Sequence, residues 1–246
     1  MNSIVLSTAN AKTSESNRLR RSLTMPLRLQ DNLISLSHCS IWYTWKNFTQ
    51  AYGNTAFSYV HIPSNTQMSA SVPDGSYSVR DINNFIHQTM LDNGHQNSDE
   101  TYDINVYANN VYNRVTITVS QDYLFVMRTG FRETLGFDTS QASLTNGQFN
   151  GNLVPKIEKV DTVLIHCNLV NNQIVSDSSI LHSFIPNQSF GTILEVKPNY
   201  PQWRFARNAT FNEIEVWFTD QSGNALAMED NILVELQIRH KRYNLE

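Results

Sequence analysis

Residues 159–170 read KVDTVLIHCNLV, and this stretch decides the fold class. From residue 163 on, every second residue in it is apolar, at Val163, Ile165, Cys167 and Leu169. This alternation is typical of a β-strand with one buried face. His166 and Cys167 are adjacent, so on a strand their side chains point to opposite faces, whereas a cysteine nucleophile needs its base within hydrogen-bonding distance. The pattern therefore favours a structural Cys167 over a catalytic His–Cys pair.

Strand-like segments recur along most of the chain. They cover residues 22–29, 32–45, 56–62, 68–72, 102–108, 111–120, 123–127, 160–170, 180–185, 191–197, 212–220 and 231–240. The turn sequence QSGN at 221–224 predicts a hairpin between the last two strands. About ten short strands with one or two helices predict a mainly β chain, an antiparallel jelly-roll sandwich with a small α/β insertion.

Residues 75–94 have helical rather than strand periodicity. Ser78 and Asp81 form a capping-box pattern, apolar residues from Ile82 onward share one helical face, and Gly94 is a stop signal. A shorter segment, residues 131–137, predicts a helical turn that packs Leu135 and Phe137.

The domain organisation follows from these segments. Residues 1–21 are polar and predict a flexible N-terminal arm. Residues 22–246 then form a single jelly-roll domain, with a helix-containing insertion at about 75–140. The turn-rich segment 138–152 is the most plausible internal boundary.

Charge is low and slightly negative. The 246 residues carry a formal net charge of −4, and 16% of them are charged, which disfavours a broad nucleic-acid-binding face. One basic cluster, Arg18, Arg20 and Arg21, lies in the predicted arm. These arginines predict a weak contact with a neighbouring subunit or with nucleic acid, and the alternative is an ordinary solvated tail.

No motif for catalysis, metal binding or cofactor binding stands out. The seven His residues form no HxxxH pattern, no CxxC is present, and the nine Gly residues do not cluster into a phosphate-binding loop. We therefore expect no catalytic residues, metal or cofactor. Cys39 and Cys167 are expected to be free thiols in a reducing compartment, although a bridge between them stays open. Neither a signal peptide nor a membrane span is predicted.

Several segments, taken in order, carry a resemblance to a known family. They are IVLSTANAKTSESN (4–17), SLTMPLRL (22–29), LISLSHCSIWYTWKN (33–47), VPDGSYSVRDINNFIHQTM (72–90), NRVTITVS (113–120), GFRETLGF (130–137), VLIHCNLV (163–170), QIVSDSSILHSF (173–184) and EVWFTDQSGNALAMEDNILVELQIR (215–239). This ordered set resembles the minor capsid, or penton, proteins of Maverick/Polinton elements and their adintovirus relatives.

The resemblance implies a structural virion protein with a jelly-roll fold. Subunits of that family form homopentamers at the vertices of an icosahedral shell, beside a larger major capsid protein, and a fibre or receptor is a further partner. Assembly would take place inside the host cell, without secretion through a signal peptide. The chain is too short for the usual double jelly roll of a major capsid protein, which supports the penton.

Three alternatives stay open at this stage. The first is a receptor- or glycan-binding jelly roll, for which exposed pairs Trp45 with Tyr52, or Tyr200 with Trp203, would be the evidence. The second is a single-jelly-roll major capsid subunit. The third is an enzyme that uses Cys167.

Overall fold

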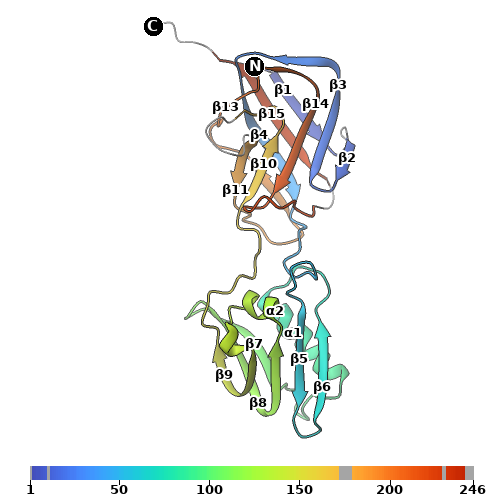
Figure 1. The fold of residues 1–246 in the computed structure, drawn as a ribbon, viewed down its shortest axis with the longest axis vertical. Helices are drawn as coiled ribbons and strands as arrows, with labels where there is room; N and C mark the ends of the chain where they lie inside the picture. Colours follow the sequence, from blue (N-terminus) through green and yellow to red (C-terminus); the bar gives the residue numbers. More distant parts are fainter. Residues whose placement is uncertain (1, 10–11, 172–178, 229–230, 242–246) are drawn as a thin grey trace. The chain divides into compact units, whose positions relative to one another are not determined.

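The computed structural model describes residues 2–9, 12–171, 179–228 and 231–241. The chain divides into two compact units (Figure 1). The first, here the sandwich unit, combines Met1–Trp45 with Val160–Glu246, and the second, the inserted unit, is Lys46–Lys159. The prediction of a single domain with an insertion at about 75–140 is therefore wrong in its bounds. The inserted unit is longer at both ends and has a hydrophobic core of its own.

Two antiparallel sheets form the sandwich unit (Figure 1). The first sheet has the order β1–β15–β4–β12, with β13 also paired to β4, and the second has the order β11–β10–β14–β3–β2. Their strands are β1 (Asn2–Ser7), β2 (Lys12–Glu15), β3 (Arg18–Leu29), β4 (Asn32–Trp42), β10 (Val163–Cys167), β11 (Ile180–Phe184), β12 (Ile193–Val196), β13 (Arg204–Phe205), β14 (Ala209–Thr219) and β15 (Leu233–His240). The fold is mainly β and is a jelly-roll sandwich, as predicted, because the chain repeatedly crosses from one sheet to the other.

One hydrophobic core lies between these two sheets. It joins Ile41 and Leu236 of the first sheet to Val163, Ile165 and Cys167 of the second. These three β10 side chains are fully buried, as their alternation predicts. The buried face of β10 therefore makes the strand part of the core, and the opposite face carries His166.

The N-terminal segment is part of the fold. β1 pairs with β15 along its whole length, and β3 begins at Arg18 and pairs with β14. Leu6 and Leu19 are fully buried in the sandwich core. The prediction of a flexible arm over residues 1–21 is therefore wrong for its described residues, and residues 1, 10 and 11 lie outside the description. The sequence pattern did not reveal β1 because Leu6 is its only fully buried side chain, and Ile4 is only partly buried against the core.

The predicted hairpin between the last two strands is also wrong. The turn at 221–224 exists, because the Asp220 carboxylate accepts hydrogen bonds from the backbone N–H groups of Ser222 and Asn224. β14 and β15 nevertheless belong to different sheets. The connection crosses the sandwich, so β15 pairs with β4 and β1 instead of with its neighbour in sequence.

The inserted unit packs two helices with one antiparallel sheet (Figure 1). The sheet has the order β6–β5–β8–β7, with β9 also paired to β8. Its elements are β5 (Ala56–His61), β6 (Thr66–Ser71), α1 (Val79–Asp92), β7 (Ile104–Asn109), β8 (Arg114–Met127), α2 (Thr129–Thr134), the 3-10 turn η1 (Thr139–Gln141) and β9 (Ser143–Asn150).

The two helical predictions are confirmed, but the boundary prediction is wrong. Ser78 and Asp81 make a reciprocal capping box at the start of α1, and Leu135 and Phe137 are fully buried after α2. The segment 138–152 is not a linker, because it contains β9, which pairs with β8. The unit ends instead at Lys159.

Candidate inter-subunit surface

The arginines predicted as contact residues lie on a sheet and not on a free arm. Arg18 and Arg20 of β3 both bond to the Glu215 carboxylate of β14, with N–O distances of 2.7 and 2.8 Å. Arg21 donates a hydrogen bond to the backbone carbonyl of Val5. The structure thus brings two of the three arginines together on one carboxylate. A contact of this cluster with nucleic acid stays a prediction.

His166 of β10 packs against Trp217 of the neighbouring strand β14. Its ring stacks on Trp217 with an interplanar angle of 7°. The Arg18 guanidinium also lies over Trp217, 5.3 Å from the ring centroid. The two His166 ring nitrogens are each 2.9 Å from a hydroxyl oxygen, of Ser179 and Thr219. Both nitrogens therefore have structural partners, on the face opposite Cys167.

The two cysteines are buried and free. Burial raises the pKa of the Cys167 thiol to about 12, and burial likewise raises the pKa of Cys39. The thiolate is the nucleophilic form of cysteine, so these environments oppose nucleophilic chemistry. Nor do three His, Cys, Asp or Glu side chains gather as a metal site anywhere in the described part of the chain.

We expect Glu215→Gln to destabilise the protein at neutral pH by about 1–3 kcal/mol, since it removes the negative charge that Arg18 and Arg20 share. Burial of Glu215 raises its pKa, but hydrogen bonds from Arg20 and Arg18 outweigh burial, and the net shift is downward. The stabilisation is therefore complete above the ordinary pKa of a glutamate and is lost as pH falls through the lower folded-state pKa.

Urea unfolding at pH 7 and pH 3 measures this effect. The gap between wild type and Glu215→Gln should narrow at the lower pH. Glu213→Gln is the matched control, because Glu213 is on the same strand but exposed. Equal stability of Glu215→Gln and Glu213→Gln at pH 7 would contradict the role given to the shared carboxylate.

The aromatic pairs that would indicate a glycan site are not open platforms. Trp45 is buried, with 4% of its surface exposed, and packs against Tyr43. Tyr200 is 84% exposed, but the Arg239 guanidinium lies 4.1 Å from the ring centroid of Trp203 and occupies one face of that ring. Trp45 therefore offers no exposed ring, and Trp203 is exposed only in part.

A different set of exposed apolar side chains lies in the segment from β11 to β13 of the sandwich unit. These residues, here called the edge surface, are Ile185, Phe190, Ile193, Tyr200 and Phe205. Between 46% and 84% of each residue is exposed. Elsewhere in the described part of this unit, the exposed large apolar residues are Val5 and Met25. Exposed apolar side chains are therefore concentrated in the segment from β11 to β13.

Strand order places this segment where both sheets end. β11 is the outer strand of the second sheet, and β12 is the outer strand of the first. A hollow of ≈ 280 Å³ lies between them. Phe184 and Ile185 line it from the β11 side, and Leu194 and Val196 line it from β12. Outer strands present unpaired backbone groups, and an exposed apolar patch beside them is typical of a protein–protein contact. The edge surface can therefore pack against another chain.

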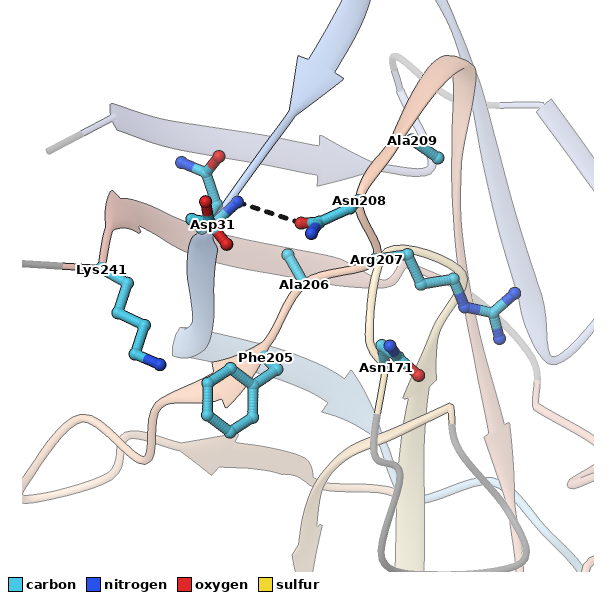
Figure 2. A pocket seen from close by; sticks show the side chains of 9 residues that line it. Asp31, Asn171, Phe205, Ala206, Arg207, Asn208, Ala209 and Lys241 are labelled. Carbon is cyan, nitrogen blue, oxygen red and sulfur yellow. Dashed lines mark hydrogen bonds between the residues drawn. The ribbon is translucent and has the colours of Figure 1, made fainter.

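A second hollow, of ≈ 700 Å³, adjoins β13 (Figure 2). Figure 2 shows the Lys241 side chain extending toward Phe205, and its amine lies 5.1 Å from the ring centroid. The Asp31 backbone N–H donates to the Asn208 side chain across the hollow, and Arg207 donates to the Val170 carbonyl. Its lining thus ties the β3–β4 turn to the β13–β14 connection.

No protein-family model matches the chain, and no curated protein matches it either. The solved structures that match include the mavirus penton protein. The alignment has a TM-score of 0.49 and 14% sequence identity, and it covers 97% of this chain and 99% of that chain.

Sequence reasoning missed the edge surface, although a signal is present. Ile185, Phe190 and Tyr200 lie among Pro, Asn, Ser and Gly residues, in the turn-like segments IPNQSFG and KPNYP. Large apolar residues inside turns are exposed unless a partner covers them.

The described residues include no helix long and apolar enough to cross a membrane.

Proposed function

We propose that this protein is a structural capsid subunit, the penton of an icosahedral shell, and that it assembles as a homopentamer through the edge surface. The observation that carries the proposal is the concentration of exposed apolar side chains where both sheets of a jelly-roll sandwich end. The ordered resemblance to penton proteins of Maverick/Polinton elements and adintovirus relatives supports the same function.

The two ends of the sandwich differ, as a ring requires. Cyclic rings use head-to-tail contacts between two different patches, which close when the rotation is right. The edge surface lies beside β11 and β12, whereas β1 and β2 are the outer strands at the other ends of the two sheets. Val5 on β1 is 42% exposed and adds an apolar side chain there. We assign the contact to the edge surface of one copy and the β1 side of the next.

The remaining partners follow from this role. A penton contacts the major capsid protein around the vertex and can carry a fibre or bind a receptor. Its location is the virion, after assembly in the host cell. The alternatives, a receptor- or glycan-binding jelly roll and a single-jelly-roll major capsid subunit, predict other oligomeric states or ligands, so mass in solution separates them from the penton.

The mass of the purified protein, by native mass spectrometry and light scattering, tests the proposal. We expect five copies for wild type and a monomer for the double variant Ile185→Asp/Ile193→Asp, because each substitution places a charge in the buried contact. Met25→Asp is the matched control, since Met25 is 78% exposed in the same unit but outside the edge surface. If wild type is monomeric alone, the same variants are compared after co-expression with the major capsid protein.

Two results would contradict the proposal. Three copies of wild type would favour a spike or another capsomer. A pentamer that persists in the double variant would remove the edge surface from the contact. Point substitutions are preferred to deletion of residues 1–21, because deletion would remove β1 and the buried Leu6.

A further inference from the structure

A hollow of ≈ 530 Å³ opens on the inserted unit, and the proposed capsid function does not account for it. It is lined by Arg132, Glu133, Asp138, Thr139, Leu153, Val154, Lys156 and Lys159. Arg132 and Glu133 come from α2, the next two residues from the turn into η1, and the last four from the segment after β9. Three cationic side chains thus converge from two separate parts of the unit.

Arg132 is buried without full pairing. Its side chain is 7% exposed, and its Nε has no hydrogen-bond partner among the described residues. The Glu133 carboxylate oxygen is 3.9 Å from the Arg132 Nη2, which is too far for a hydrogen bond. A buried charged donor without an acceptor is costly. The guanidinium therefore lines the hollow with hydrogen-bonding capacity left over.

The lining carries one more positive charge than negative. Arg132, Lys156 and Lys159 are cationic, and Glu133 and Asp138 are the carboxylates. Asp138 already accepts hydrogen bonds from Ser140 and Asn152. Burial and the neighbouring Lys156 lower the pKa of Lys159, while Glu133 acts in the opposite direction. A single negative charge would balance the hollow, whereas a dianion would be repelled by the two carboxylates.

Apolar side chains stand beside these cations. Leu153 is 49% exposed and Val154 is 62% exposed, on the same wall as Lys156. Backbone hydrogen bonds of 2.9 Å hold this wall to the helical side, from Leu153 N–H to the Gly136 carbonyl and from Lys156 N–H to the Thr134 carbonyl. The hollow is therefore preformed, with apolar and cationic side chains on the wall from 153–159 and Arg132 on the helical side.

We propose that this hollow binds a carboxylate that carries an apolar group. A carboxylate has one negative charge, and it is the acceptor that a guanidinium such as that of Arg132 binds best. The apolar group then covers Leu153 and Val154. The same chemistry occurs in a free organic acid with a hydrocarbon chain and at the C-terminus of a protein that ends in an apolar residue.

Titration of the full-length protein with N-acetyl-leucine, followed by ¹⁵N NMR, tests this proposal. N-acetyl-leucinamide lacks the charge, inorganic phosphate lacks the apolar group, and octanoate represents the free acids. For so small a ligand we expect a Kd on the order of 1 mM. Resonance shifts should map to residues 132–139 and 153–159. Tighter binding of N-acetyl-leucine than of octanoate would assign the site to a protein C-terminus, and the reverse order to free acids.

Variants separate specific binding from a general charge effect. Lys156→Gln should weaken N-acetyl-leucine binding about tenfold, as expected for one charge-assisted hydrogen bond. Arg132→Lys keeps the charge but loses the paired donors, and it should also weaken binding. Arg80→Gln is the matched control, because Arg80 is an exposed cation of the same unit that does not line the hollow. Equal binding of acid and amide, or an unchanged Kd in Lys156→Gln, would overturn the proposal.

Discussion

Phe131→Ala is expected to lower the free energy of unfolding of the inserted unit by about 3–5 kcal/mol, the usual cost of removing a fully buried phenylalanine. The Phe131 ring is fully buried on α2 and lies 5.5 Å from Phe57 and 6.1 Å from Phe48, measured between ring centroids. Phe57 in turn lies 5.6 Å from Phe125 of β8. Phe131 thus joins α2 to the sheet through a chain of aromatic contacts, and alanine would leave a cavity at its centre.

Hydrogen exchange read by mass spectrometry measures this effect unit by unit. Amides within Lys46–Lys159 should exchange faster in Phe131→Ala, because the core that protects them belongs to this unit alone. Val111→Ala is the matched control, since Val111 is an 84% exposed apolar residue of the same unit. A variant with wild-type protection at β5 and β8 would show that the aromatic cluster collapses around the missing ring.

Local patterns predicted the elements whose side chains alternate between core and solvent. β10 has this form, since Val163, Ile165 and Cys167 are all buried on one face. α1 has an equally strong signal, because its capping box and its buried stripe agree. Where one face of an element reaches a core, hydrophobic periodicity carries the information.

Elements with few core contacts were missed for the converse reason. β9 reads SLTNGQFN and buries only Leu144, so its composition is that of a turn. β1 buries only Leu6, so its composition is that of a tail. Each is held mainly by backbone pairing with a neighbouring strand, and that pairing leaves little trace in side-chain character.

The sequence pattern also did not indicate which distant strands pair with each other. β15 pairs with β4, nearly the whole chain away, and the neighbouring β14 belongs to the other sheet. The edge surface depends on this order, because only the order reveals that β11 and β12 lie at the ends of their sheets. Arg132 is a similar case, since an arginine in a short polar helix gives no sign that its side chain is 7% exposed.

Gly136→Ala is expected to destabilise the inserted unit by about 3 kcal/mol, the combined cost of left-handed backbone and a backbone clash. Gly136 follows α2 with φ of +82°. An added Cβ would lie 2.5 Å from the Leu153 carbonyl oxygen and 2.9 Å from the Pro155 nitrogen. Neither atom can rotate away, because both are backbone, so the segment that forms the wall of the carboxylate hollow must move.

Gly94 supplies the control that separates these two costs. It follows α1 in the same unit with φ of +73°, but an added Cβ would meet nothing within 4 Å. Gly94→Ala should therefore cost only about 1 kcal/mol, the left-handed penalty alone. Urea unfolding of the two variants measures the difference. Because Gly136 accepts the hydrogen bond from Leu153, only Gly136→Ala should also weaken N-acetyl-leucine binding. Equal losses of stability in both variants would mean that the 153–156 segment moves away from the added Cβ without a further loss of stability. The hollow would then not be preformed.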